Sequence, residues 1–252
     1  MYHISSNFYS LAYTDDDIKG DVKTHCISYG RCNFRCAYCS FKFRDDYVKY
    51  SPEILARKFE ILASRSLYFK FTGGEPLLNP DIFEDLKKVK ELNGVVFLDT
   101  NGSMPYIAEK LFKNRLADIM GISIKGLNAE EALEKTGISN KALCWDNPFT
   151  TLDIAQKYGI KTIATMIFDA SRPIEQLYDF AELIKPYKNI RLKVNNLLPG
   201  PQQGNQAYYA RDREELLNAL KEFVNNNPEW KNRTTLINGQ DAVTNTNCVV
   251  YL

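Results

Sequence analysis

The regular alternation of short apolar runs with amphipathic stretches most constrains how this chain can fold. Six runs have the length and the β-branched or aromatic content of buried strands: Thr24–Ser28, Tyr68–Phe71, Val95–Leu98, Ile119–Ile124, Thr162–Phe168 and Ile190–Val194. Amphipathic, helix-like stretches lie between them, for example near Asp81–Leu92 and Ile174–Ile184. Strands joined by helices pair in parallel, and crossovers of one hand curl the sheet. We therefore predict an α/β fold, a partial (βα)6 TIM-like barrel of parallel strands with a C-terminal extension.

The predicted strands divide the chain into a barrel and two flanking segments. Residues 1–22 are expected to form an N-terminal arm, and residues 23–200 contain all six predicted strands. Residues 201–252 are expected to form a C-terminal extension of the same domain, with weak strand signals at Thr235–Ile237 and Val249–Tyr251. Because barrel-like α/β folds commonly occupy about 250 residues as one unit, we expect a single domain.

The charge balance argues against two classes of partner. The chain has 32 Lys and Arg residues against 31 Asp and Glu residues, so no basic field indicates binding to nucleic acid or to an anionic membrane. No apolar run approaches the about 20 residues that a membrane-spanning helix requires. The segment Met1–Ser6 lacks the basic and apolar parts of a secretion signal. We therefore expect a cytoplasmic protein without a nucleic-acid or membrane partner.

Three of the six cysteines lie close together directly after the first predicted strand, in the segment Arg-Cys32-Asn-Phe-Arg-Cys36-Ala-Tyr-Cys39. In a chain without an export signal, such crowding favours a metal centre over disulfides. Besides a redox-active or incidental group of cysteines, two kinds of metal centre are open at this point. An iron–sulfur cluster held by the three thiolates would leave one iron open to another ligand. A zinc ion held by the same thiolates would take His25 or His3 as its fourth ligand.

A second motif, Gly73-Gly74-Glu75-Pro76, follows the second predicted strand. Two successive glycines allow the backbone to approach a ligand that a Cβ would block, and they tolerate a positive φ. Glu75 and nearby carbonyls can accept hydrogen bonds from an ammonium group, while Pro76 stiffens the exit of the loop. The alternative for the two glycines is a simple strand-to-helix turn.

The two motifs, in this order, resemble those of the radical S-adenosylmethionine (SAM) superfamily. The resemblance implies a [4Fe–4S] cluster on Cys32, Cys36 and Cys39, with the amine and carboxylate of SAM on the fourth iron. It also implies an external electron donor, flavodoxin or a similar protein, and a 5′-deoxyadenosyl radical that abstracts hydrogen from the substrate. Tyr38 matches the aromatic residue that this family usually has before its third cysteine. The residues that the resemblance assigns to SAM binding here are Tyr38, Gly73, Gly74, Glu75 and Pro76.

Polar residues at the ends of the third and fourth predicted strands resemble those of one branch of this superfamily. The segments Asp-Thr-Asn101-Gly and Ser123-Ile-Lys125 look like those of the activating enzymes of glycyl radical proteins, such as the activases of anaerobic ribonucleotide reductase and pyruvate formate-lyase. The match implies that Asn101, Ser123 and Lys125 bind SAM, Lys125 through the SAM carboxylate. Ser123 stands where those enzymes commonly carry an aspartate, and in this the chain departs from the branch.

Strand order alone adds two residues to the expected SAM pocket. Met166 lies near the end of the fifth predicted strand and Asn195 follows the sixth, and ligands bind at the carboxyl ends of parallel strands. Cys248 is a candidate hydrogen donor to a substrate radical, because an S–H bond is weaker than most C–H bonds; burial as a packing residue is its alternative. Cys26 and Cys144 are expected to be buried packing residues.

Three functions follow from these patterns. In the leading hypothesis, the substrate is a glycyl radical enzyme and this chain is its activase, as the Asp-Thr-Asn-Gly segment suggests. In the second, the substrate is a ribosomally made peptide or a small metabolite that is epimerised, cyclised or rearranged; the Ser123 departure supports it. The third is a zinc-stabilised binding module without catalysis.

Overall fold

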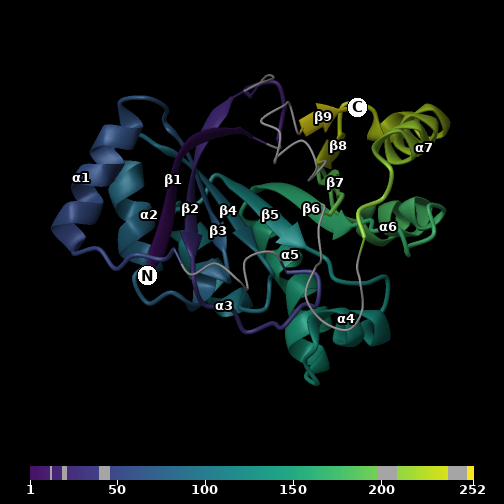
Figure 1. Ribbon diagram of the computed structural model, residues 1–252, viewed down its shortest axis with the longest axis horizontal. Helices are drawn as coiled ribbons and strands as arrows, with labels where there is room; N and C mark the ends of the chain where they lie inside the picture. The colour runs from purple at the N-terminus through teal and green to yellow at the C-terminus, as the bar shows by residue number, and fades with distance from the viewer. Residues whose placement is uncertain (12, 19–21, 40–45, 198–208, 238–248) are drawn as a thin grey trace.

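The computed structural model of the chain describes residues 1–252 apart from 12, 19–21, 40–45, 198–208 and 238–248. Within these ranges the centre is one curled sheet of nine strands, which lie side by side in chain order. The strands are β1 (Tyr2–Ser10), β2 (Lys23–Tyr29), β3 (Tyr68–Gly73), β4 (Val95–Thr100), β5 (Ile119–Ser123), β6 (Lys161–Ile167), β7 (Arg191–Asn195), β8 (Thr234–Ile237) and β9 (Val249–Tyr251). The helices lie around the outer side of the curl (Figure 1).

Strands β2 to β8 run parallel, and β1 and β9 pair antiparallel with β2 and β8 at the two edges. The predicted α/β class with a partial barrel of parallel strands is thus confirmed. The six predicted strands are β2 to β7, and the two weak strand signals of the tail are β8 and β9. β1 was not expected, because its polar segment lacks an apolar run; its pairing with β2 places Tyr2 opposite Tyr29.

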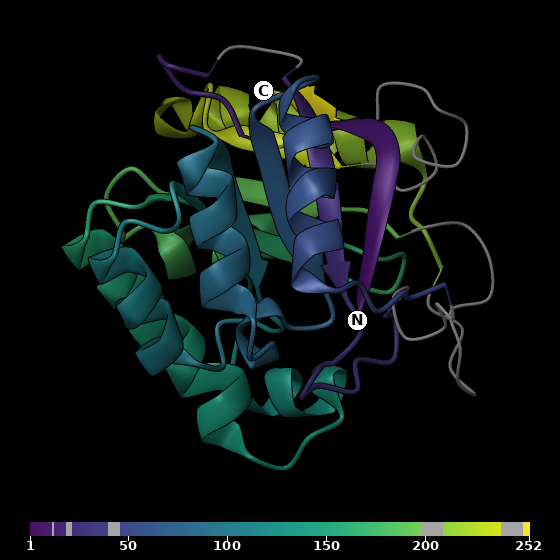
Figure 2. The same ribbon diagram turned by 90° about the vertical axis from the view of Figure 1, so that its left-hand side faces the viewer.

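The helices are α1 (Pro52–Ala63), α2 (Ile82–Glu91), α3 (Pro105–Lys113), α4 (Ala129–Thr136), α5 (Asn147–Lys157), α6 (Gln176–Ile184) and α7 (Arg213–Asn226). The Ser51 side chain caps the start of α1, because it accepts a hydrogen bond from the N–H of Ile54. α4 was not predicted, although Asn128 caps its start and Gly137 ends it with a φ of 63°. Helices α1 and α2 lie side by side over the outer face of the sheet (Figure 2). No helix in the described ranges is long and apolar enough to cross a membrane.

The two faces of the sheet differ in character, because successive side chains of a strand point to opposite sides. The outer face packs against the helices and forms the main core, with Phe59 of α1, Phe71 of β3, Leu98 of β4 and Val194 of β7 among its members. This core therefore fixes which residues of each strand point inward, toward the concave side.

The segment after β1 covers part of the concave side near the amino ends of the strands. Leu11, Tyr13 and Ile18 are buried there against Phe97 of β4 and Ile163 of β6. The carboxyl ends of the parallel strands lie at the opposite edge, where ligands of such sheets bind. The site is therefore expected in the loops that follow β2 to β7.

Candidate active site

The three-cysteine loop follows β2 and is held from both sides. The N–H of Arg35 donates to the Thr136 carbonyl at the end of α4, at 2.8 Å. Cys36 is buried, Cys39 is half-buried and Cys32 is exposed, and all three are free thiols. An apolar cluster behind the loop consists of Phe34, Cys36, Tyr38, Ala132, Cys144 and Leu197. The sulfurs thus lie between a packed apolar wall and solvent.

A network of amide hydrogen bonds ties the cysteine loop to the end of β4. Asn101 donates from Nδ2 to Asn33 Oδ1 at 2.9 Å, and Asn33 donates from Nδ2 to Ser103 Oγ at 2.8 Å. Two donors also point at the Cys32 sulfur: the N–H of Phe34 at 3.4 Å and Asn101 Nδ2 at 3.9 Å. Hydrogen bonds to ligating sulfurs are one of the features by which proteins tune the reduction potential of a cluster.

The Gly73–Pro76 loop after β3 packs directly on the cysteine loop. The N–H of Gly74 donates to the Tyr29 carbonyl at 2.7 Å, and the N–H of Glu75 donates to the Arg31 carbonyl at 2.6 Å. Gly73 has a φ of 103°, as the sequence led us to expect. A Cβ on Gly74 would lie 2.0 Å from the Arg31 oxygen. The space that a side chain at this position would occupy is therefore the cysteine loop itself, rather than the ligand space that we expected.

Glu75 is completely buried and ties the end of β3 to the end of β4. Its Oε1 accepts hydrogen bonds from the N–H of Leu77 at 3.0 Å and from Thr100 Oγ1 at 2.6 Å, and its Oε2 accepts from the N–H of Asn101 at 2.7 Å. Burial raises the pKa of Glu75 to about 7, although these hydrogen bonds act in the opposite direction. Its role in SAM binding, and that of the adjacent buried Pro76, stay predictions.

Lys125 lies close to the cysteine loop. Its Nζ is 5.8 Å from the centre of the Tyr38 ring. Burial raises the pKa of Cys32 to about 11 and also raises that of Cys36, while the positive charge of Lys125 opposes both shifts. Because the thiols are protonated at neutral pH, metal binding would release protons. Ser123 is half-buried at the end of β5, two residues before Lys125.

The last two expected SAM-pocket residues lie on opposite faces of the sheet. Asn195 ends β7 and is half-buried, and its buried Oδ1 has no hydrogen-bond partner among the described residues. Met166 is 1% exposed and belongs to the main core on the helix side, so Thr165 is the neighbour that β6 turns inward. The contact of Met166 with SAM stays a prediction that this placement does not support. Cys248 lies outside the described residues, and its role as a hydrogen donor also stays a prediction.

Sequence reasoning missed a group of charged side chains on the inner face of the barrel. Lys70 of β3 and Asp99 of β4 form an ion pair at 2.8 Å, and Lys193 of β7 is buried. Lys70 and Lys193 each interrupt an apolar strand run, as in Phe69-Lys-Phe71, and Asp99 directly follows one. Charged residues are seldom buried unless they are paired, so a single charge inside a strand is the signal that could have revealed them.

The described residues fit an iron–sulfur cluster better than a Cys3His zinc site. The chain has two histidines. His3 Nδ1 lies 2.9 Å from Asp46 Oδ2, and His25 Nε2 lies 2.7 Å from the Leu62 carbonyl under α1. In the described part of the chain, no three His, Cys, Asp or Glu side chains are grouped as ligands of one metal ion. Three thiols with donors directed at a sulfur, and no histidine beside them, suit a cluster with one open position.

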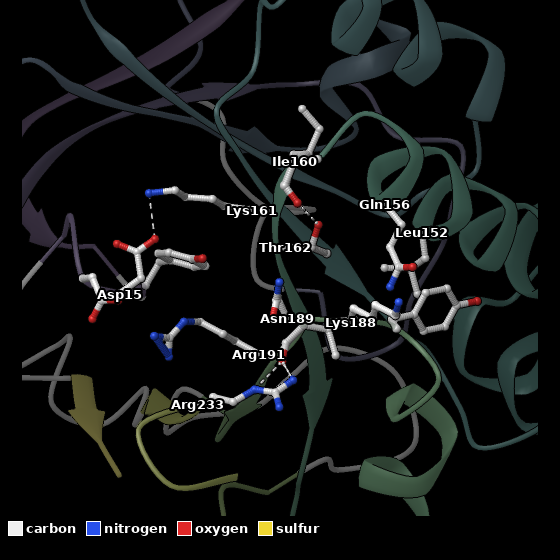
Figure 3. A pocket seen from close by; sticks show the side chains of 15 residues that line it. Asp15, Leu152, Gln156, Ile160, Lys161, Thr162, Lys188, Asn189, Arg191 and Arg233 are labelled. Atoms are coloured by element: carbon white, nitrogen blue, oxygen red, sulfur yellow. Dashed lines mark hydrogen bonds and ion pairs between the residues drawn. The ribbon is translucent and has the colours of Figure 1, made fainter. Parts of the chain in front are cut away.

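A separate cavity of about 570 Å³ lies at the opposite end of the strands. Lys161 at the start of β6 and Arg191 at the start of β7 line it, together with Arg233 (Figure 3). Lys161 pairs with Asp15 at 2.7 Å. Because this cavity lies at the amino ends of the strands, we do not include it in the candidate site.

The remaining cysteines have different surroundings. Cys144 is 2% exposed in a π-helical turn, Ala142–Asp146, and packs in the apolar cluster behind the cysteine loop, so its predicted burial is confirmed. Cys26 of β2 is half-buried rather than buried as expected, and its sulfur lies 3.8 Å from Ser28 Oγ.

Comparisons with known proteins agree with the geometry. Residues 26–184, more than half of the chain, match the Radical SAM superfamily. A GTP 3′,8-cyclase from Staphylococcus carnosus is 27% identical over 76% of this chain and 59% of its own length. An S-adenosylmethionine-dependent nucleotide dehydratase from Flammeovirga pacifica is 29% identical over 87% of this chain and 76% of its own length.

Two further similarities concern the branch and the fold. A putative glycyl-radical enzyme activating enzyme from Methanocaldococcus jannaschii is 34% identical, over 38% of this chain and 40% of its own length. A radical SAM methyltransferase from Sphaerobacter thermophilus has the same fold, with a TM-score of 0.70 and 12% identity over 91% of this chain and 70% of that one. The chain thus spans about 40 to 60% of the length of two of these three curated relatives.

Proposed function

This chain belongs to the radical SAM superfamily and is an enzyme, and we propose that it modifies a small metabolite by radical chemistry. One observation carries the proposal. Three thiols, the Gly73–Pro76 loop and Lys125 converge at the carboxyl ends of the parallel strands. The loops are joined by backbone hydrogen bonds and by the Asn33–Asn101 contact, so the arrangement is built into the fold.

Each of Cys32, Cys36 and Cys39 would hold one iron of a [4Fe–4S] cluster. When bound, the cluster supplies the electron that cleaves SAM to methionine and a 5′-deoxyadenosyl radical, which abstracts a hydrogen atom from the substrate. We propose that a flavodoxin or similar protein is the external electron donor. The buried Phe34 and Leu197 form part of an apolar wall behind the loop, and such a wall limits access of water to a reactive radical.

The chain's own residues would bind and orient SAM. The residues proposed for this are Tyr38, Gly73, Gly74, Glu75, Pro76, Asn101, Ser123, Lys125 and Asn195. Met166, which the sequence also suggested, is left out because it lies in the main core. Lys125 would pair with the SAM carboxylate, because its ammonium lies over Tyr38 beside the cysteine loop. The backbone of the Gly73–Pro76 loop offers carbonyl oxygens that can accept from the SAM ammonium.

A small-metabolite substrate has more support than a glycyl radical enzyme. The relatives named for GTP cyclisation and nucleotide dehydration match 76% and 87% of the chain, against 38% for the relative named as an activase. Ser123 in place of the aspartate common in activases points the same way. The match covers 59% of the cyclase, so the proposed substrate class rests on the chemistry of the site as well as on this similarity.

The proposal also covers how the chain is divided into segments. We propose that the arm of residues 1–22, the barrel of residues 23–200 and the extension of residues 201–252 form one domain. The sheet supports this, because it continues from β1 through the barrel to β9. A cytoplasmic location, expected from the sequence, is also part of the proposal.

The test uses anaerobically reconstituted protein with SAM and dithionite, to which candidate substrates are added singly. A small metabolite that is the substrate should increase the formation of 5′-deoxyadenosine and yield a product of its own, both seen by mass spectrometry. If instead only a glycyl radical protein responds, and shows the EPR doublet of a glycyl radical, the activase function replaces the one proposed here.

A further inference from the structure

We propose that the inner face of the barrel binds a phosphate group of the substrate, through Lys193 with help from Lys70 and Thr165. The inference rests on the proposed function, because it names the substrate class of the same site. It also identifies residues that lie away from the cysteine loop and that no SAM-binding motif includes.

Lys193 and its neighbours face inward from adjacent strands. The outer residues of β7, such as Val194, belong to the main core, so Lys193 and Asn195 point to the concave side. In the parallel register, Thr165 of β6 is opposite Lys193. Lys70 and Asp99 face the same side from β3 and β4, because Phe71 and Leu98 beside them belong to the main core.

The charges of this group are not balanced within the described chain. Lys70 pairs with Asp99 at 2.8 Å, whereas Lys193, 2% exposed, makes no hydrogen bond or ion pair with the described residues. Burial alone would raise the pKa of Asp99, but the charges of Lys70 and Lys193 hold it at about 2, so both lysines lie near this carboxylate. Burial lowers the pKa of Lys193 to about 8. A buried ammonium without a partner is unfavourable and indicates a place for an anion.

Two uncharged polar atoms beside Lys193 also lack partners. Thr165 Oγ1 and Asn195 Oδ1 are buried and have no hydrogen-bond partner among the described residues. Buried polar atoms in folded proteins are normally satisfied. A phosphate oxygen would accept from Lys193 Nζ and Thr165 Oγ1, and a hydroxyl of the same ligand would donate to Asn195 Oδ1. The three atoms together thus fit a phosphorylated molecule that also carries hydroxyl groups.

Burial on the inner face decreases toward the edge where the cysteine loop lies. Ser123, Ile167 and Asn195, the last residues of β5, β6 and β7, are half-buried, while Thr165 and Lys193, two residues earlier, are buried. Two residues of a strand span about 7 Å. On the other strands of the inner face, the side chains of Lys70 and Asp99 are 26% and 18% exposed. A phosphate at Lys193 would therefore lie below the reacting end of the substrate.

A phosphate suits this position better than a carboxylate of SAM. Lys125 lies at the rim beside Tyr38 and is placed to take the SAM carboxylate. Lys70, Asp99 and Lys193 together carry one net positive charge deeper on the inner face. A phosphate ester, which is anionic near neutral pH, would offset this charge.

The experiment measures the binding of tripolyphosphate, CTP, GTP and the two nucleosides to iron-loaded protein with SAM, by isothermal titration calorimetry. Lys193→Met should weaken binding of at least one phosphate compound about tenfold or more, since a hydrogen bond to a charged group is lost. Lys193→Arg, which keeps the charge, should retain most of the affinity. Lys110→Met is the matched control, because Lys110 lies over Tyr106 on the outside of α3 and should have no effect.

Several results would overturn the inference. For the wild-type protein, these are the absence of saturable binding of any phosphate compound, or nucleosides that bind as tightly as nucleotides. For Lys193→Met, they are a phosphate affinity equal to that of wild type, or a loss of SAM affinity alone. Lys193→Met should also fold with an unchanged or higher thermal midpoint, because it removes a buried unpaired charge; failure to fold would contradict the premise. Wild-type protein that forms 5′-deoxyadenosine but binds no phosphate refutes this inference alone. Phosphate binding without SAM cleavage refutes only the proposed function.

Discussion

At the residue scale, the surroundings of the cysteines distinguish them from one another. The Cys32 sulfur accepts a hydrogen bond from the N–H of Phe34 and lies near Asn101 Nδ2. The positive charge of Lys125 acts on Cys36 and opposes the rise of its pKa. Cys26, in contrast, lies within β2 beside Ser28. The spacing of three cysteines was visible in the sequence, whereas the donors around them depend on contacts between β2, β4 and β5.

We predict that Ala in place of Cys32, Cys36 or Cys39 removes most of the iron and abolishes SAM cleavage, because three thiolates are the fewest that hold such a cluster with one open iron. Iron and sulfide analysis with the visible absorption spectrum checks the prediction. Cys26→Ala is the control and should keep normal iron. A variant of the three that retains both iron and activity would refute the ligand assignment.

Gly74→Ala should also reduce iron retention, because the new Cβ would lie 2.0 Å from the Arg31 carbonyl and displace the cysteine loop. From the sequence alone we expected such a change to affect SAM binding only. Gly30→Ala is the control, since a Cβ there comes no closer than 3.4 Å to the Tyr47 ring. Normal iron content in Gly74→Ala together with weakened SAM binding would restore the earlier interpretation.

The charge of Lys193 gives a pH-dependent prediction. Its pKa is lowered to about 8 in the folded protein from 10.5, so between these values the unfolded chain binds more protons and stability rises with pH. The destabilising effect of this lysine is therefore fully present below pH 8 and is lost toward pH 10.5. Urea unfolding should show Lys193→Met more stable than wild type at pH 7, with a smaller difference at pH 9.5. A difference that does not change with pH would contradict the burial of the charge.

At the scale of elements, the ends of β3 and β4 act as one unit. Glu75 joins them by accepting from Leu77, Thr100 and Asn101, and Asn101 in turn holds Asn33 of the cysteine loop. The motif around Glu75 was visible in the sequence. The links that its carboxylate makes within the fold became visible only in the structure.

Glu75→Gln should lower the free energy of unfolding by about 1–3 kcal/mol, because the new amide cannot accept from both sides and one buried N–H loses its partner. Urea unfolding of the iron-free protein at pH 8.5, above the pKa of about 7, measures the effect with the carboxylate ionised. Glu91→Gln is the control, because Glu91 is exposed at the end of α2 and should change little. Equal stability of the two variants would show that Glu75 does not support the loop.

The elements that the sequence predicted are those with a strong local signal. β2 to β7 have apolar runs, and α2 and α6 have apolar faces at helical spacing. β1 depends on its antiparallel register with β2, which no pattern within its own segment reveals. The sequence also did not show which residues of each strand point toward the concave side. One residue of offset separates Thr165, on the inner face, from Met166, in the main core.

At the scale of the whole molecule, the curled sheet separates two regions. The amino ends of the central strands are covered by Leu11, Tyr13 and Ile18, and the carboxyl ends carry the cysteine loop and the Gly73–Pro76 loop. Fold class and cluster loop followed from the sequence because strand–helix alternation and cysteine spacing are local. The inner charges Lys70, Asp99 and Lys193 meet only when β3, β4 and β7 curl around one interior.

The measurement that tests the central claim most directly is the formation of 5′-deoxyadenosine from SAM by the anaerobically reconstituted protein with dithionite. We predict about three to four iron atoms per chain, as one [4Fe–4S] cluster requires. We also predict 5′-deoxyadenosine that depends on both SAM and reductant and is absent in the Cys36→Ala variant. Colourless protein that carries one zinc per chain after anaerobic purification, or iron-loaded protein that leaves SAM intact under reduction, would contradict the account.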